Sequence, residues 1–167
     1  MSTEHRKYGS IIDNISKEDI SEMSFGLVVS QWNSQITENL YNGANETLLS
    51  SGVDEGNIFR LNVPGSFELI YGSKLLYESN TSIDAIISIG SLIEGETKHF
   101  DYICQAVSNG IKDLNIKYSI PFIFCVLTDN NIEQSIARSG GKLGNKGIES
   151  AICAMDMAVL NRRKLSK

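Results

Sequence analysis

The feature that most constrains the fold of this chain is a regular alternation of short apolar runs with longer segments of helical periodicity. The predicted strands span residues 25–30, 58–63, 85–90 and 121–128, and only the second of them, IFRLNV, is interrupted by strongly polar side chains, Arg60 and Asn62. The first run, FGLVVS, is continuously apolar, as is typical of a strand buried on both faces. Strands that alternate with helices pair in parallel through right-handed crossovers. The sequence therefore predicts a three-layer α/β/α fold around a four-stranded parallel sheet.

Five helices are expected between and after these strands, most with a stripe of apolar side chains that faces inward. The first carries Ile36, Leu40, Ala44 and Leu48 and ends near Ser51 and Gly52; the second carries Phe67, Ile70, Tyr71 and Leu75; the third begins near His99 and carries Ile103, Val107 and Ile111. The last two are expected at residues 131–139 and 148–162, separated by the glycine-rich break SGGKLGNKG.

The length of 167 residues suits one compact domain. Residues 1–23 are polar and show no sustained period, so we interpret them as an N-terminal arm and residues 24–167 as a single domain. Within the arm, Tyr8–Ile12 (YGSII) is long enough to add an edge strand to the sheet of a neighbouring molecule. A disordered terminus is the alternative interpretation of the arm.

Charge and hydropathy exclude several classes of partner. The formal net charge of −5 argues against a nucleic-acid-binding protein, which needs a basic face. A small phosphorylated ligand remains compatible, because one arginine can hold a phosphate on an acidic protein. No apolar run approaches the roughly 20 residues of a membrane span, and the polar first residues lack a signal-peptide core. A cytoplasmic protein that binds no membrane is therefore expected.

The three cysteines, Cys104, Cys125 and Cys153, lie far apart, each in an apolar stretch. Buried, reduced thiols are therefore predicted in preference to catalytic thiolates, because no basic residue is placed nearby to stabilise a thiolate. No group of His, Cys, Asp or Glu has the spacing of metal ligands, so no metal and no cofactor is expected.

In an open parallel sheet, ligands bind outside the carboxyl ends of the strands. Four loops follow those ends here, at residues 31–34, 63–68, 90–99 and 128–131. The residues that carry chemistry are expected in these loops and at the helix ends beside them.

The first two loops carry aromatic and acidic side chains. Trp32 is the only tryptophan, and it is either a packing aromatic or a platform for a planar heterocycle. Phe67 fits the inward face of its helix, so core packing would account for it. Glu68 lies in the first turn of that helix, where interaction with the helix dipole would by itself explain a carboxylate.

The third loop enters a helix near Thr97, where free N–H groups and a hydroxyl form a phosphate site, although the P-loop pattern is absent. His99 is one of two histidines, and its place at this edge favours proton transfer over a structural role. Arg138 ends the short fourth helix, where the dipole favours any cation, so its position does not distinguish a surface arginine from a ligand-binding one.

Three motifs occur together and in a fixed order: VPGSFE at Val63–Glu68, SIGSLIEGETKHFDY at Ser88–Tyr102 and NIEQSIARSGGKLGNKG at Asn131–Gly147. With them, the chain resembles lumazine synthase from about Ser24 to Leu160. The resemblance implies a flavodoxin-like domain and a transferase of riboflavin biosynthesis. That family joins 5-amino-6-(D-ribitylamino)uracil to 3,4-dihydroxy-2-butanone 4-phosphate and releases phosphate and water.

The resemblance also implies a set of site residues, each matched by position. By role they are Trp32 for stacking on the pyrimidine; Ser66, Phe67 and Glu68 for the ribityl chain; Ser91, Leu92 and Ile93 for the uracil; Glu96, Thr97 and Arg138 for the phosphate; and His99 for proton transfer. Glu96 is expected to contribute only its backbone N–H, because its carboxylate would repel a phosphate. Lys146 and Glu149 match charged positions near the site, without an assigned role.

Assembly is a further implication of the resemblance. Phe124 matches an aromatic that a neighbouring subunit supplies, so a ring of at least five chains is expected. Members of the family form pentamers, paired pentamers and icosahedral shells, and the short link SGGKLGNKG, which has no insertion, favours a sixty-subunit shell.

Three alternatives stay open at this point. An archaeal-type riboflavin synthase needs no phosphate site, and Arg138 with Thr97 speaks against it. A receiver domain needs an acidic cluster after its first strand, where this chain has Gln31, Trp32 and Asn33. A non-catalytic flavin- or lumazine-binding module would share the fold and lack the activity.

Overall fold

A four-stranded parallel sheet forms the centre of the molecule in a computed structural model that describes residues 20–80 and 82–165. The strands are β1 (Phe25–Ser30), β2 (Ile58–Val63), β3 (Ala85–Ile93) and β4 (Phe122–Asp129). Their order is β2-β1-β3-β4, and every neighbouring pair is parallel. The predicted sheet is therefore confirmed, although β3 runs three residues further than the apolar run that predicted it.

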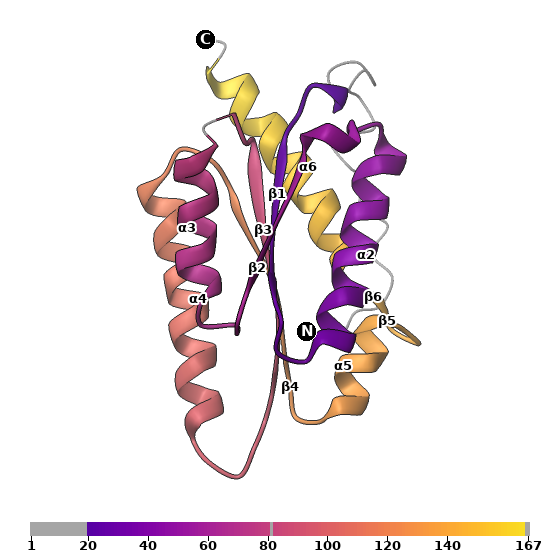
Figure 1. Cartoon of the computed structure of the whole chain (residues 1–167), viewed down its shortest axis with the longest axis vertical. Helices are drawn as coiled ribbons and strands as arrows, with labels where there is room; N and C mark the ends of the chain where they lie inside the picture. The colour runs from indigo at the N-terminus through magenta and orange to yellow at the C-terminus, as the bar shows by residue number, and fades with distance from the viewer. Residues whose placement is uncertain (1–19, 81, 166–167) are drawn as a thin grey trace.

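Helices cover both faces of the sheet (Figure 1). One layer contains α2 (Ser34–Ser51), α5 (Ile132–Arg138) and α6 (Lys146–Leu165), and the other contains α3 (Leu69–Ser79) and α4 (His99–Lys117). A short 3-10 helix, η2 (Glu55–Asn57), precedes β2. The three layers and the five helices agree with the prediction.

Two hydrophobic clusters, one on each face of the sheet, form the core. Alternate residues of a strand point to opposite faces, so Leu27 and Val29 pack under α2 and α6, whereas Val28 packs under α3 and α4. The first cluster also includes Ile20 and Met23, two residues of the segment that the sequence assigns to the arm. The Tyr8–Ile12 segment lies outside the described residues.

The inward face of α3 differs from the predicted one. Phe67 is 52% exposed and Tyr71 is 66% exposed, so the prediction that they face the core is wrong. The residues that α3 buries are Leu69, Gly72 and Ser73. A Cβ atom on Gly72 would lie 2.6 Å from Cγ1 of Val63, so the small residues let the helix approach the sheet and leave the large ones outside.

A small hairpin occupies the glycine-rich segment before α6, where the sequence predicted only a break. It pairs β5 (Ser139–Gly141) with β6 (Gly144–Asn145) in antiparallel orientation. Gly140 and Gly144 have φ angles of 118° and 83°, a region that favours glycine.

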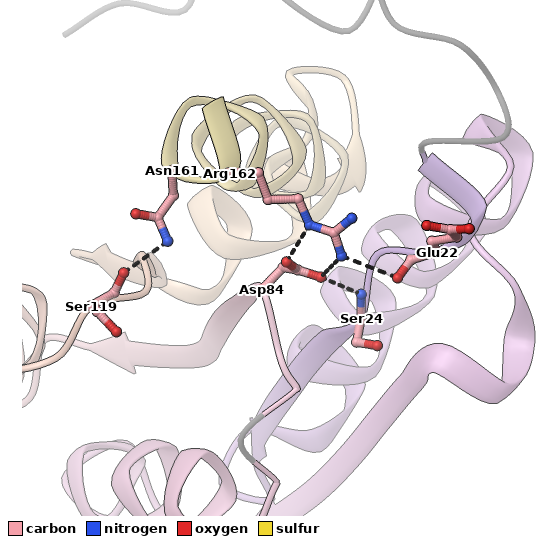
Figure 2. Close-up of polar contacts among 6 residues, drawn as sticks. All are labelled: Glu22, Ser24, Asp84, Ser119, Asn161 and Arg162. Carbon is pink, nitrogen blue, oxygen red and sulfur yellow. Dashed lines mark hydrogen bonds and ion pairs between the residues drawn. The ribbon is translucent and has the colours of Figure 1, made fainter. Parts of the chain in front are cut away.

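A polar cluster fastens the last turns of α6 to the amino ends of the strands (Figure 2). Arg162 binds both carboxylate oxygens of Asp84, with Nε–Oδ1 and Nη2–Oδ2 distances of 2.6 and 2.7 Å. The backbone N–H of Ser24 donates to the same carboxylate, and Arg162 also donates to the carbonyl of Glu22. Asn161 donates to the carbonyl of Ser119 beside it. This end of the sheet is opposite the carboxyl ends (Figure 1).

The cysteine prediction holds for one residue of three. Cys125 is buried, and burial raises the pKa of its thiol to about 11, whereas Cys104 is half-buried and Cys153 is exposed. Cys104 belongs to α4 and Cys153 to α6, and the apolar sequence around them did not reveal that these positions are only partly covered. None of the helices in residues 20–80 and 82–165 is both long and apolar enough to cross a membrane.

Candidate active site

The four loops selected from the sequence lie together at the carboxyl edge of the sheet, the lower end in Figure 1. Hydrogen bonds connect each loop to a neighbour. They run from the Gln31 N–H to the Val63 carbonyl (2.8 Å), from Asn33 Nδ2 to the Ser91 carbonyl (3.2 Å) and from the Glu94 N–H to the Asp129 carbonyl (2.9 Å). Through these hydrogen bonds the four loops form one continuous surface at the carboxyl edge of the sheet.

Trp32 projects from the loop after β1 and is 71% exposed. A shallow depression beside it is lined by residues 31–36 and by Ile132 of α5. Its ring therefore does not pack in the core of its own chain, and one face remains open to a planar ligand or to a neighbouring chain.

The loop after β2 combines a buried hydroxyl with two exposed side chains. Ser66 is 4% exposed, and its Oγ has no hydrogen-bond partner in the described part of the chain. A Cβ atom on Gly90 would lie only 2.8 Å from that Oγ, so the absence of a side chain at Gly90 lets this loop rest against β3. Phe67 and Glu68 are exposed, and the Glu68 side chain makes no cap hydrogen bond to α3. Its carboxylate is thus available for a ligand.

The end of β3 has an open backbone edge. The ladder between β1 and β3 ends at the pair Val29 and Ile89, because the chain turns away after Ser30, whereas β3 continues to Ile93. Ser91 is completely buried, and its Oγ also has no partner within residues 20–80 and 82–165. The half-buried Leu92 and Ile93 extend along this edge.

The third loop enters α4 at His99, as the sequence predicted. Glu96, Thr97 and His99 are all exposed, and Thr97 Oγ1 accepts a long hydrogen bond (3.4 Å) from the His99 N–H. This helix start offers N–H groups to an anion, with an imidazole one turn or less away.

Arg138 ends α5 and has a partner that the sequence did not suggest. Its Nε lies 3.7 Å from Oδ1 of Asp129, a carboxylate that is only 8% exposed. The Ser135 hydroxyl donates to the other oxygen of Asp129 at 2.8 Å. Arg138 is therefore not a fully solvated surface arginine. The signal that could have revealed Asp129 is its place directly after an apolar strand, in the fourth of the selected loops.

The structure does not bring every predicted residue to this edge. Phe124 is the register partner of Ser88, three residues before Ser91, so it lies nearer the amino end of the sheet on the outer strand β4, where it is 41% exposed. Lys146 and Glu149 form an ion pair (Nζ–Oε2 2.6 Å) in the first turn of α6. In the described residues, no group of three or more His, Cys, Asp or Glu side chains is arranged to bind a metal ion.

Comparison with known proteins decides the family. The profile of 6,7-dimethyl-8-ribityllumazine synthase matches residues 22–162. The chain belongs to the lumazine synthase family. A lumazine synthase of Christiangramia forsetii is 59% identical over 141 residues, which are 84% of each chain. One of Flavobacterium johnsoniae is 53% identical over 163 residues (98% of this chain, 85% of that one), and one of Bacteroides fragilis is 51% identical over 135 residues (81% and 94%).

The predicted resemblance is thus confirmed at the level of the lumazine synthase family and its α/β fold. The archaeal-type riboflavin synthase and the non-catalytic module are not favoured by these relatives. The role of each site residue stays a prediction.

Proposed function

We propose that this chain catalyses the lumazine synthase reaction of riboflavin biosynthesis, in which 5-amino-6-(D-ribitylamino)uracil and 3,4-dihydroxy-2-butanone 4-phosphate condense with release of phosphate and water. The observation that carries the proposal is the match of the family profile to residues 22–162. The arrangement of the elements supports it, because Trp32, Glu68, His99 and Arg138 all belong to loops or helix ends at the carboxyl edge of the sheet.

The pyrimidine subsite lies between the first and third loops. The exposed indole of Trp32 stacks on the flat ring. The backbone edge at Ser91, Leu92 and Ile93, where the Ser91 carbonyl is already bonded to Asn33, provides its remaining N–H and carbonyl groups for the uracil. The exposed Glu68 carboxylate accepts hydrogen bonds from the ribityl hydroxyls, beside Ser66 and Phe67.

The phosphate subsite combines Arg138 with the start of α4. A guanidinium donates two parallel hydrogen bonds to a phosphate, and Asp129 faces Arg138 on its Nε side. Thr97 and the backbone N–H of Glu96 are placed before the first turn of α4. Phosphate is a good leaving group, so positioning and neutralisation by these groups are sufficient without a metal.

His99 transfers protons between the steps. The amine attacks the ketone, water leaves to give an imine, a proton is lost, and phosphate departs before the second ring closes. An imidazole can take up and return a proton at neutral pH, and the His99 side chain is exposed at the start of α4. Holding two reactants in register is worth at most about 7–11 kcal/mol of the barrier.

We also infer that the active assembly is a ring of five chains in a cytoplasmic protein, and that the rings join into a sixty-subunit shell. Two features support self-association. Phe124 lies away from its own loops, so a neighbouring chain would have to use it. In addition, the chain exposes several large apolar side chains that contacts between subunits could cover, among them Tyr71, Tyr102 and Ile116.

The decisive experiment is a turnover assay with both substrates, followed by two single variants. His99→Ala is expected to lower kcat by about 10²–10⁴-fold, the usual contribution of a general acid/base, and to leave measurable catalysis by positioning.

Arg138→Ala is expected to raise KM for the sugar phosphate, because the phosphate loses its main counter-charge. A wild-type KM for the sugar phosphate in Arg138→Ala would contradict its role. Turnover of the lumazine without the sugar phosphate would instead identify a riboflavin synthase.

A further inference from the structure

Asn33 follows Trp32 in the loop between β1 and α2 and has an unusual backbone. It is the one non-glycine residue with a positive φ angle among residues 20–80 and 82–165, with φ 56° and ψ 46°. Asparagine tolerates this left-handed region better than most residues, and such a conformation persists where the surroundings hold it.

The side chain of Asn33 does not serve its own helix. Asn33 is the N-cap residue of α2, and its backbone carbonyl accepts from the N–H groups of Ile36 and Thr37 at 2.9 and 3.1 Å. An N-cap asparagine usually accepts a further helix N–H with its side-chain oxygen, and that hydrogen bond is absent at this helix. Instead, Nδ2 donates to the carbonyl of Ser91, 58 residues away in the sequence, at 3.2 Å.

The Ser91 carbonyl needs this donor because β1 no longer accompanies β3. The last pair between the two strands is Val29 and Ile89, and Ser91 is completely buried. A buried carbonyl without a partner is costly, so the amide of Asn33 replaces the strand that has turned away. The same hydrogen bond fixes the loop of Trp32 at a set distance from the end of β3.

We propose that Asn33 is a positioning residue of the pyrimidine subsite. It holds the Trp32 loop against β3, so that the indole and the backbone edge at Leu92 and Ile93 keep the spacing that a stacked, hydrogen-bonded pyrimidine requires. Asn33 contacts no substrate atom in this role; it lowers the cost of ordering the site when the pyrimidine binds. The inference rests on the proposed roles of Trp32 and of the β3 edge.

Two variants of the full-length protein test this. Asn33→Gly and Asn33→Asp both tolerate a positive φ angle, and both lack the N–H donor. For both, KM for the aminouracil is expected to rise about 3- to 10-fold, the loss typical of one hydrogen bond, while KM for the sugar phosphate changes less than twofold. Quenching of Trp32 fluorescence by a pyrimidine analogue is expected to need a higher analogue concentration by the same factor.

Asn131→Asp is the matched control. It makes the same chemical change at the same edge, but Asn131 uses its oxygen as an acceptor from the Gln134 N–H, which aspartate retains. Its KM for the aminouracil is expected to stay within twofold of the wild type.

Two outcomes overturn the inference. A wild-type aminouracil KM in both Asn33 variants would mean that only the backbone conformation matters. Equal increases in both KM values would indicate a general loss of structure. If the wild-type protein binds the analogue but does not turn over the two substrates, the proposed reaction fails, and the binding comparison still tests Asn33.

Discussion

Exposure divides the candidate residues at the carboxyl edge into two kinds. Trp32, Phe67 and His99 are exposed, whereas Ser66 and Ser91 are buried, with hydroxyl groups that have no partner within the described residues. Buried hydroxyls usually find a partner, so they mark positions where a ligand, a neighbouring chain or water completes the structure. The candidate site therefore combines buried residues of the sheet edge and the loop after β2 with exposed aromatic and imidazole side chains.

The exposed indole gives a direct test of the pyrimidine subsite. Since Trp32 is the sole tryptophan and is 71% exposed, its emission reports on one position only. A pyrimidine or flavin analogue is expected to quench it strongly and with saturation, because stacking places the ring against the indole. Calorimetry on the same sample supplies the independent binding curve. Unchanged emission at a concentration where calorimetry reports saturation would remove Trp32 from the subsite.

For single residues, the sequence predicted which of them lie at the carboxyl edge of the sheet, but it did not predict their contacts. Trp32, Glu68, His99 and Arg138 follow strand ends or border helix ends, and position after a strand is readable from a pattern. The contact of Arg138 with Asp129 depends on how α5 packs against β4, which no local pattern records.

Helices α2 and α6 pack so closely at Gly147 that an added methyl group there is expected to lower the stability of the protein more than at the other glycines. A Cβ atom on Gly147 would lie 1.9 Å from the carbonyl oxygen of Leu40, a backbone atom that cannot rotate away. Gly147→Ala is therefore expected to lower the free energy of unfolding by about 1–3 kcal/mol or more, since one helix must move. Denaturation in urea at a fixed protein concentration measures the change.

Gly56→Ala is the control for this comparison. Among residues 20–80 and 82–165, no atom lies within 4 Å of a Cβ atom built at Gly56, which is in η2. The same added methyl group is expected to change stability by less than about 0.5 kcal/mol there. Equal stability of the two alanine variants would mean that α2 and α6 are not packed as closely as described.

Helices and strands could be predicted from the sequence where the apolar pattern was compatible with only one of the two. Three of the four strands of the parallel sheet are apolar runs that are too short for a helix, so their type was readable and their ends were within a few residues. The face of α3 was wrong because large apolar residues occupy two sides of that helix, and the packed side uses Gly72 and Ser73 instead. The β5–β6 hairpin was missed because glycines and polar residues give it no apolar alternation.

In the molecule as a whole, the two ends of the sheet differ in function and in structure. The carboxyl ends hold the candidate site, and the amino ends hold the Arg162–Asp84 cluster that anchors α6 (Figures 1 and 2). Both side chains make three hydrogen bonds in this cluster, but Asp84 is the more buried of the two (13% against 40% exposed), and it is the acceptor of the buried Ser24 N–H.

This asymmetry predicts the order of two variants. Asp84→Ala is expected to cost about 2 kcal/mol and Arg162→Ala about 1 kcal/mol, because Arg162 is 40% exposed and solvent screens part of the attraction. The exposed neighbour Arg163 is the control, since Arg163→Ala removes the same charge and is expected to change little. KM for both substrates stays at the wild-type value in all three. A larger loss in Arg162→Ala than in Asp84→Ala would contradict this account of the cluster.

The oligomeric state can be predicted, because the proposed site needs Phe124 from a neighbouring chain. Phe124 lies on the outer strand, three residues from the site edge toward the amino end of the sheet, and the hairpin of β5 and β6 forms the short link before α6. If each chain supplies Phe124 to the next, the same heterologous contact repeats from chain to chain, and such a series either closes into a ring or grows without limit. A closed ring is therefore expected. Sedimentation velocity and light scattering on fresh protein are expected to give the mass of sixty chains. A mass near five chains across several buffers would exclude the shell and retain the ring, and a monomer at micromolar concentration would exclude both.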